Sequence, residues 1–364
     1  MKNISLLLVL LCVLSACAHK SAPQSGDELV MLVGTISGKG GNGLYSYRFN
    51  QENGESVLLD SLALDNPTFF SLNGEKVYAI TENNDMDDAL CCVNLNKENG
   101  HMVVQNSQVA GCAGPCYVDC RGNMAVTAHY AGGALVKYTL DGEGNVADAT
   151  IAHLGSVIGT HPNQKSAHVH CSMFSQDGRY LFMTDFSADR VLQFAVGDEL
   201  VLVDSVMVRP NSGPRHITFS PDGRFAYVIG ELSGEVTAFR FDNERLEKIQ
   251  TVMSDTVDAQ GSADIHVTRD GRFLYASNRL KADGLAIFSI DRKTGMLNKV
   301  GYQLTGIHPR NFVITPNDKY VLVACRDSNV IQVYERNVET GLLSDVKKDI
   351  VLDKPVCVRF AEKR

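Results

Sequence analysis

The chain has 364 residues, 44% hydrophobic and 21% charged, a composition typical of ordered globular proteins and not of disordered ones. Its 34 Lys and Arg against 42 Asp and Glu give a formal charge of -8, which argues against a nucleic-acid partner, because a phosphate backbone is bound by cationic surface. The chain is longer than a domain with a single hydrophobic core usually is, so we expect either two domains or a repeat architecture.

The N-terminal segment resembles an export signal. Lys2 precedes an apolar run over 4–14, which is too short for a membrane span of about 20 residues. The run continues into a Leu-Ser-Ala-Cys sequence that resembles a bacterial lipobox and ends at Cys17. We therefore expect a lipoprotein signal peptide over 1–16, a lipid anchor on Cys17 that holds the protein at the membrane of the cell envelope, and a polar tether over 17–28. An ordinary cleaved signal peptide is the alternative.

Eight further cysteines follow, and in an oxidising envelope they could form disulfides whose pairing the sequence does not indicate. Cys112, Cys116 and Cys120 are spaced by four, as on one face of a helix, but their segment is rich in Gly and has no His at ligand spacing. Buried thiols or one disulfide are therefore favoured over a metal site. We expect no metal and no cofactor.

From residue 29 onward the chain repeats one unit: a turn of the Asp-Gly type, an apolar run that ends in a polar residue, and a second apolar run. The clearest copies span 174–196, 219–241, 267–290 and 314–336, and weaker ones span 71–82 and 119–140. The second residue of the turn is Gly74, Gly122, Gly178, Gly223, Gly271 and Asp318 in successive copies, at spacings of 48, 56, 45, 48 and 47.

This period, filled by four short strands, is typical of a propeller blade, although the absence of Trp disfavours the WD type. The segment 355–360 resembles the innermost strand of a further unit. The segments 30–37 and 43–49 resemble the second and third strands of a unit that lacks its first. Joining the two ends closes a ring of seven blades and leaves no open sheet edge. The sequence thus predicts an all-β fold, one seven-bladed β-propeller over 29–364 closed by its terminal strands.

The repeat also predicts which side chains meet. In a blade the first strand is innermost and the second runs antiparallel beside it, so positions equally far before and after the turn face each other at one end of the ring. Eight residues before the turn residue stand Asn66, Gly114, His170, Arg215, Ala263 and Arg310; eight after it stand Glu82, Tyr130, Phe186, Glu231, Arg279 and Arg326.

Seven of these twelve positions are Arg, Glu or His. Charges at the mouth of a narrow channel must pair with one another or with a ligand, and guanidinium groups suit an anionic, oxygen-rich ligand. Arg215 and Glu231 could instead form a structural ion pair within one blade, and His168 and His170 could be core residues. Arg310 occupies the same place as Arg215 in another blade, which favours a ligand role.

Five short motifs form a set around these positions: His168-Val-His170, Gly213-Pro-Arg-His216, Glu231-Leu-Ser, Ser277-Asn-Arg279 and Pro309-Arg-Asn-Phe312. The set resembles the seven-bladed propeller lactonases, which include bacterial propeller-type 6-phosphogluconolactonases and the fungal carboxymuconate cyclase. The similarity runs from about Val33 to Phe360. The resemblance implies the predicted fold and a sugar lactone as substrate, with a catalytic group made of His170, Arg215, Glu231 and Arg279.

The expected reaction is hydrolysis of an anionic sugar lactone. His170 or Glu231 would take a proton from the attacking water, and Arg215 and Arg279 would stabilise the oxyanion and hold the acidic group of the substrate. The motifs of serine hydrolases, zinc hydrolases and P-loops are absent from the sequence, so activated water is expected. Four further residues are expected to contact the substrate: Arg310, Asn66, Glu82 and His168.

Two other functions fit the same pattern. One is a cycloisomerase of the carboxymuconate cyclase type, because a cationic centre would also stabilise an enolate. The other is a non-catalytic envelope propeller that binds anionic sugars or a protein. Cys171 and Arg326 depart from the pattern of the family, which leaves the substrate open. An extracytoplasmic location also fits poorly with a phosphorylated sugar lactone, which is made in the cytosol.

Overall fold

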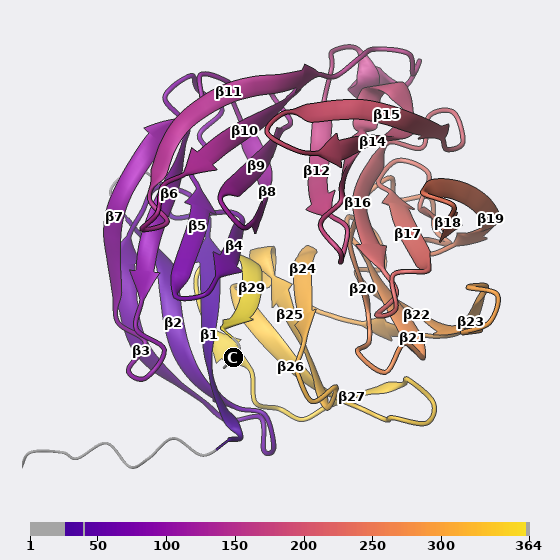
Figure 1. Cartoon of the computed structure of the whole chain (residues 1–364). Coiled ribbons are helices and arrows are strands. Elements are labelled where there is room, and N and C mark those ends of the chain that lie inside the picture. The colour runs from indigo at the N-terminus through magenta and orange to yellow at the C-terminus, as the bar shows by residue number, and fades with distance from the viewer. Residues whose placement is uncertain (1–25, 39–40, 362–364) are drawn as a thin grey trace, which may run out of the picture.

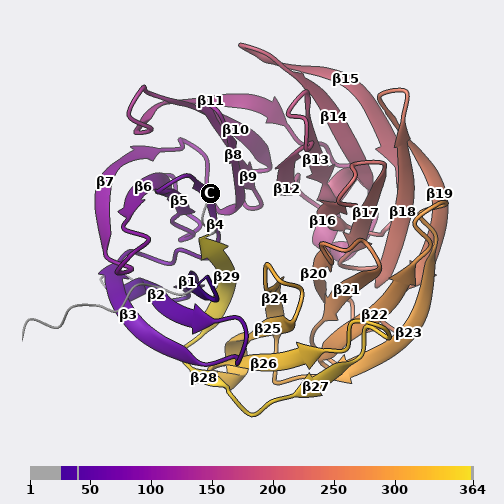
Figure 2. The same ribbon diagram turned by 60° about the horizontal axis from the view of Figure 1, so that its bottom comes forward.

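The computed structural model describes residues 26–38 and 41–361, which form a ring of seven sheets around a central axis (Figures 1 and 2). Each sheet is one antiparallel blade whose strands run outward from the axis in order. The predicted all-β, seven-bladed propeller is confirmed. The predicted signal peptide, the lipid anchor on Cys17 and most of the tether lie outside the described residues.

The blades are numbered in chain order, starting with the one that contains both chain ends. Blade 1 consists of β29 (Pro355–Ala361), β1 (Glu28–Thr35), β2 (Asn42–Asn50) and β3 (Ser56–Ala63). Blade 2 consists of β4 (Phe70–Asn73), β5 (Lys76–Ile80), β6 (Ala89–Leu95) and β7 (Met102–Val109). Blade 3 consists of β8 (Pro115–Arg121), β9 (Met124–His129), β10 (Ala134–Leu140) and β11 (Val146–Leu154). Blade 4 consists of β12 (Val169–Phe174), β13 (Tyr180–Asp185), β14 (Arg190–Val196) and β15 (Leu200–Met207).

The remaining three blades follow the same order. Blade 5 consists of β16 (Pro214–Phe219), β17 (Phe225–Gly230), β18 (Glu235–Asp242) and β19 (Arg245–Met253). Blade 6 consists of β20 (Ser262–Val267), β21 (Phe273–Asn278), β22 (Gly284–Ile290) and β23 (Leu297–Leu304). Blade 7 consists of β24 (Pro309–Ile314), β25 (Tyr320–Cys325), β26 (Val330–Arg336) and β27 (Leu343–Asp345), with β28 (Ile350–Val351) also paired to β26. Among the described residues, three single-turn 3-10 helices lie in connections: η1 (Pro162–Gln164), η2 (Phe186–Ala188) and η3 (Arg326–Ser328).

The ring closes where the two ends of the chain meet. Strand β29 pairs antiparallel with β1, with Val358 opposite Val33 and Arg359 opposite Leu32. The inner strand of blade 1 therefore comes from the C-terminal end, and its other three strands come from the N-terminal end. This is the predicted seam, and it pairs the strand edge that an open ring would expose.

Burial within a blade follows distance from the axis. The second strands β13 and β25 are mostly apolar and are buried along their whole length, because blades cover both of their faces. The outer strand β15 has no buried residue, and most of its residues are exposed. The core lies between neighbouring blades: Phe182 of blade 4 packs on Phe219 and Phe241 of blade 5, with ring centroids 5.1 and 5.4 Å apart.

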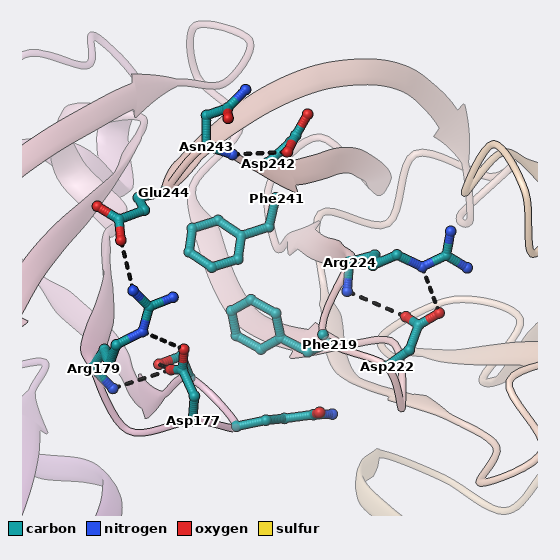
Figure 3. Close-up of a pocket in the computed structure, with 12 residues that line it drawn as sticks. Asp177, Arg179, Phe219, Asp222, Arg224, Phe241, Asp242, Asn243 and Glu244 are labelled. Atoms are coloured by element: carbon teal, nitrogen blue, oxygen red, sulfur yellow. Dashed lines mark hydrogen bonds and ion pairs between the residues drawn. The ribbon is translucent and has the colours of Figure 1, made fainter.

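The ring has two faces. The turn face carries the hairpins between first and second strands, and the opposite face is called the mouth face. A hollow of about 400 Å³ on the turn face lies over Phe219 and Phe241, between blades 4 and 5 (Figure 3). Arg179 Nε is 2.6 Å from Asp177 Oδ2, and Arg179 Nη1 is 2.6 Å from Glu244 Oε1. Because these exposed charges already pair with one another, this hollow makes a weaker ligand site than the mouth face.

The cysteines of the described residues are all free thiols. Cys116 and Cys120 lie in strand β8, with Cys112 in the loop before it, so the spacing of four does not mark a helix. Within 26–38 and 41–361 no group of three or more His, Cys, Asp or Glu is arranged to hold a metal ion. The same residues include no helix long and apolar enough to cross a membrane.

Candidate active site

A cavity of about 580 Å³ opens on the mouth face, and it contains seven of the eight residues predicted to catalyse or bind. Blades 2 to 7 all contribute to it. The lining residues are Glu82, Asn84, Cys116, Tyr130, Ala131, His168, His170, Arg215, Glu231, Arg279 and Arg310. Side chains separated by more than 200 residues of sequence are therefore neighbours, as the repeat predicts.

A β-bulge at the start of the inner strand places one lining side chain in each of four blades. The register between inner and second strand shifts at Cys116, His170, Arg215 and Arg310, so each of these stands between two paired residues. A bulge bends the strand and redirects the extra side chain, which here lines the cavity. Pro comes directly before the bulge in three of these blades, at 115, 214 and 309, where a strand start tolerates the missing N–H.

The residues that face these inner-strand positions directly follow the ends of the second strands. The backbone N–H of Glu231 donates to Gly213 O at 2.8 Å, and the N–H of Arg279 donates to Gly261 O at 3.1 Å. In each case the acceptor lies two residues before the inner-strand position. Glu82 and Tyr130 make the same backbone bond in blades 2 and 3. This bond holds the second-strand residue beside the bulge, as antiparallel pairing across the turn predicts.

Asn66 is the predicted substrate-binding residue that does not line the cavity. In blade 2 the inner hairpin is tight, with Asn73 opposite Lys76, whereas in blade 4 Phe174 pairs with Leu181 across a longer turn. In blade 2, counting eight residues back from the turn residue therefore reaches a residue two positions before the one that corresponds to Arg215. Thr68 holds the place that corresponds to Arg215, and its hydroxyl donates to Glu82 Oε2.

Asn66 instead shapes the loop before the inner strand. Its φ of 42° lies in the left-handed region, which Asn tolerates better than most residues. Its side-chain oxygen accepts from Gly38 N at 2.9 Å, and its amide donates to Asn83 Oδ1 at 2.8 Å. Blade 3 has an equally tight hairpin, so the same shift explains why the offset pointed to Gly114 and missed Cys116.

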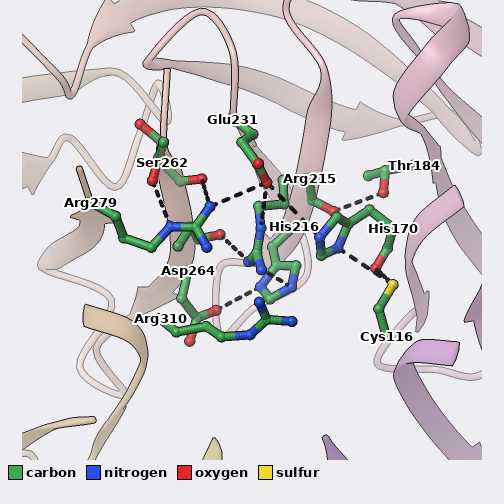
Figure 4. Close-up of polar contacts among 12 residues, drawn as sticks. Cys116, His170, Thr184, Arg215, His216, Glu231, Ser262, Asp264, Arg279 and Arg310 are labelled. Carbon is green, nitrogen blue, oxygen red and sulfur yellow. Dashed lines mark hydrogen bonds and ion pairs between the residues drawn. The ribbon is translucent and has the colours of Figure 1, made fainter. Parts of the chain in front are cut away.

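Glu231 is the centre of the site. Its Oε2 lies 2.8 Å from Arg215 Nε, 3.4 Å from Arg279 Nη2 and 4.0 Å from His170 Nε2 (Figure 4). The ion pair between Arg215 and Glu231 considered from the sequence is therefore present, but it belongs to a four-residue cluster and is not confined to one blade. Two guanidinium groups against one carboxylate leave this cluster cationic.

Backbone carbonyl groups hold both guanidinium groups in place. Arg215 Nη1 donates to Ala263 O at 2.7 Å, and Arg279 Nε donates to Gly261 O at 2.7 Å. Arg215 is 2% exposed and Arg279 is 6% exposed. Burial lowers the pKa of Arg215 from its usual value and lowers the pKa of Arg279 to about 9. Both side chains remain cationic at neutral pH.

His170 is 5% exposed, and burial, followed by the charge of Arg215, lowers its pKa well below the usual range. The imidazole is therefore neutral at pH 7 and can accept a proton. Cys116 Sγ lies 3.8 Å from His170 Nδ1, and the thiol donates to the backbone oxygen of His170 at 3.3 Å. Burial raises the pKa of Cys116 well above its usual value, so this group stays a thiol.

Tyr130 and His168 form one wall of the cavity. Their rings stack in parallel, with centroids 4.0 Å apart and planes at 5°. His168 Nδ1 lies 2.6 Å from Tyr130 O and must donate, because a carbonyl only accepts; Nε2 then accepts from Ser166 Oγ at 3.1 Å. Both ring nitrogens of His168 are thus engaged by the protein. Burial raises the pKa of Tyr130 to about 12, so its hydroxyl is a neutral donor.

Arg310 and Glu82 form a second ion pair in the cavity, with Arg310 Nη2 3.6 Å from Glu82 Oε2. Arg326 occupies the position in blade 7 that corresponds to Arg279, but its Nε binds Asp327 Oδ1 at 2.6 Å, and it is not part of the lining. The sequence offset placed Tyr130 and Arg326 in the same row of positions. Only the side-chain geometry shows that Tyr130 lines the cavity and Arg326 does not.

The chain is similar to known proteins over nearly its whole described length. A family model described as "Lactonase, 7-bladed beta-propeller" matches residues 30–360. A 6-phosphogluconolactonase from Formosa agariphila is 34% identical over 342 residues, which cover 89% of this chain and 97% of the relative. The crystal structure of a candidate 6-phosphogluconolactonase from Bacteroides uniformis matches with a TM-score of 0.90 and 51% identity, over 92% of this chain and 100% of that one. A periplasmic gluconolactonase from Pseudomonas aeruginosa matches with a TM-score of 0.85 and 28% identity, over 92% and 99%.

Proposed function

The chain belongs to the seven-bladed β-propeller lactonases, and on that premise we propose that the mouth cavity hydrolyses a sugar lactone to the corresponding sugar acid. One observation carries the proposal: a single carboxylate oxygen, Glu231 Oε2, contacts two buried guanidinium groups and lies 4.0 Å from a neutral imidazole nitrogen. This arrangement combines a proton acceptor with cations placed for a developing oxyanion.

His170 is the proposed general base. A water molecule between His170 Nε2 and Glu231 Oε2 would lie within hydrogen-bond reach of both atoms, since they are 4.0 Å apart. As the water oxygen attacks the lactone carbonyl carbon, one water proton moves to Nε2. Glu231 stabilises the imidazolium that forms, while Arg215 and Arg279 hold Glu231 in place beside it.

Arg215 and Arg279 are the proposed oxyanion donors. The tetrahedral intermediate carries its negative charge on the former carbonyl oxygen, and a preorganised guanidinium stabilises that charge. When the intermediate collapses, the bond from the carbonyl carbon to the ring oxygen breaks. The imidazolium of His170 returns its proton to the leaving alkoxide, so the products are a carboxylate, the sugar hydroxyl and one released proton.

The lining also supports an anionic group on the substrate. Three lining cations, Arg215, Arg279 and Arg310, stand against two lining carboxylates, Glu82 and Glu231, which leaves one net positive charge. Arg310 pairs with Glu82 and not with Glu231, and it is the proposed contact for a substrate carboxylate or phosphate. Tyr130 would donate a hydrogen bond to a sugar oxygen. These roles apply to a phosphorylated aldonolactone and to a uronolactone alike.

The export signal supports a location in the cell envelope through a lipid on Cys17, and the resemblance to a periplasmic gluconolactonase is consistent with it. Strand β1 enters the ring at the turn face, because its last residue, Thr35, pairs with Pro355 at the mouth end. A tether from Cys17 would therefore join the ring on the face opposite the cavity. This location favours a lactone without phosphate as the physiological substrate.

A panel of lactones with and without phosphate or carboxylate, assayed by proton release on protein that lacks residues 1–17, tests the activity. We expect Arg215→Ala and His170→Ala to lower kcat/KM by about 100-fold or more. Arg245→Ala is the control, because Arg245 is an exposed arginine of the outer strand β19 and lies outside the lining, and it should retain the wild-type rate. Wild-type rates in both site variants would contradict the proposal, as would turnover of a muconate without opening of any lactone.

A further inference from the structure

Behind each of the two guanidinium groups of the cluster lies a histidine, and an aspartate lies beside each histidine. His216 Nε2 lies 3.1 Å from Arg215 Nη1, and its Nδ1 lies 2.8 Å from Asp264 Oδ1 (Figure 4). The second copy is looser: His308 Nε2 lies 3.4 Å from Arg279 Nη1, and its Nδ1 lies 3.5 Å from Asp327 Oδ2. The order of groups is the same in both.

The tautomer of His216 follows from its neighbours. A guanidinium only donates, so the atom that faces it, His216 Nε2, must accept and carries no proton. The imidazole proton then sits on Nδ1 and is donated to Asp264. Burial, followed by the charge of Arg215, lowers the pKa of His216 to about 3, so the ring stays neutral and this arrangement persists at neutral pH.

We propose that Asp264 and His216 are positioning residues for Arg215: Asp264 keeps the His216 proton on Nδ1, and this leaves Nε2 free to hold the guanidinium where the oxyanion forms. Asp327 and His308 act in the same way, and more weakly, on Arg279. The effect on turnover rests on the proposed function, whereas the proton position on His216 does not.

Asp264 is bound as such a role requires. Besides His216, its Oδ1 accepts from Ile265 N at 3.0 Å, and its Oδ2 accepts from His266 Nε2 at 2.9 Å and from Phe312 N at 3.2 Å. Asn311 Nδ2 also donates to Oδ2, at 2.5 Å. Donors from blades 5, 6 and 7 thus converge on both oxygens of a carboxylate that is almost fully buried.

This environment makes Asp264→Asn an informative change. An amide offers one acceptor and one donor, but donors face the group on both sides, so either orientation sets an N–H against an N–H. With the amide nitrogen toward His216, Nδ1 would have to accept. The proton would then move to Nε2, facing the N–H of Arg215, and the guanidinium would lose this support.

Positioning of this kind would appear in turnover. The described hydrogen bonds of the Arg215 side chain use Nε, for Glu231, and Nη1, for Ala263 and His216, which leaves Nη2 for the substrate. A misplacement of about 1 Å can lower a rate by about 100-fold. We therefore expect Asp264→Asn and His216→Phe to lower kcat by about 10- to 100-fold with little change in KM, because the loss falls on the transition state.

A double-mutant cycle separates positioning from simple structural damage. On the Arg215→Ala background, Asp264→Asn should lower kcat by no more than about a further twofold, because Arg215, the residue through which Asp264 acts, is already absent. His266→Gln is the matched control, since His266 binds the other oxygen of the same carboxylate. It should keep kcat within about twofold of wild type. Equal losses from Asp264→Asn on both backgrounds would overturn the proposal.

A second measurement remains valid if no lactone is opened. In protein labelled with ¹⁵N-histidine, the His216 signals can be identified by their absence from His216→Phe. The wild type should show a protonated Nδ1 and an unprotonated Nε2 at neutral pH, and Asp264→Asn should reverse or mix them. A wild-type His216 with its proton on Nε2 would refute the positioning role, whereas the expected tautomer without any lactone turnover would refute only the proposed function.

Discussion

His170 and Arg279 lie almost fully buried in the same cluster, and burial lowers the pKa of each. The two shifts have opposite consequences for the proposed roles. A lowered pKa keeps His170 neutral and able to accept a proton. The lowered pKa of Arg279 makes its cationic form easier to lose than that of an exposed arginine. Glu231 offsets part of this cost by contacting both guanidinium groups.

These shifts predict a bell-shaped dependence of kcat/KM on pH for a lactone that does not itself ionise in this range. Protonation removes the base, so the acid limb should lie below pH 6.5, the usual pKa of histidine. Deprotonation of Arg279 should produce a basic limb near pH 9. Initial rates corrected for spontaneous opening provide the measurement. Arg279→Ala should be slower and lack the basic limb, and an acid limb above pH 7 would argue against His170 as the base.

At the scale of strands and hairpins, a repeated hydrogen bond joins one blade to the next. The tyrosine four residues after the turn glycine donates its hydroxyl to a glycine carbonyl in the outer hairpin of the following blade. Tyr227 donates to Gly295 O at 3.1 Å, and Tyr275 donates to Gly341 O at 2.6 Å. A Cβ at Gly295 would lie 2.2 Å from the ring of Phe225, so this hairpin must keep its glycine.

We expect Tyr227→Phe and Tyr275→Phe each to lower the free energy of unfolding by about 1–2 kcal/mol, because a buried carbonyl loses its donor. Lactone turnover should not change, since both tyrosines lie outside the cavity lining. Tyr302→Phe is a suitable control: it removes a 2.6 Å bond to Ala282 O that is exposed, so water can replace the donor. Urea denaturation measures the three changes, and equal losses at buried and exposed sites would contradict this explanation.

At the scale of the whole molecule, seven blades close on themselves, and the cavity exists only in the closed ring. Blades 2 to 7 contribute its lining, whereas blade 1 has the apolar Ile36 and Val356 at the equivalent positions. Blade 1 therefore closes the ring but supplies no side chain to the cavity lining. Its two halves come from opposite ends of the chain, so they meet only when the ring forms.

Removal of residues 355–364 should abolish cooperative folding, because β1 would lose its inner neighbour and expose a long apolar edge. The truncated chain should aggregate and show no single unfolding transition by circular dichroism. A circular permutant that joins 361 to 28 by a short linker and opens the exposed outer hairpin at 197–199 keeps all seven inner strands. It should fold and retain lactone turnover. A soluble, cooperatively folded truncation would show that the seam is dispensable.

Much of the site followed from the sequence because turn spacing and antiparallel pairing together place residues. The offset of eight found His170, Arg215 and Arg310 where the inner hairpins have equal length. It failed at Asn66 because the hairpin of blade 2 is two residues shorter, which periodicity alone does not report. Periodicity does not predict the β-bulges either, because a register shift depends on how two strands pair and not on the sequence of either strand alone.

The sequence by itself determined the number of blades, the seam between the two ends, and the gathering of basic and acidic groups at one mouth. These properties depend on period, apolar pattern and residue type, all of which are local. The tertiary structure decided which members of each row line the cavity, that Thr68 and Cys116 hold inner-strand positions, and that Asp264 and His216 stand behind Arg215. Those contacts join different blades, so they depend on packing and hydrogen-bond geometry that arise only once the ring has closed.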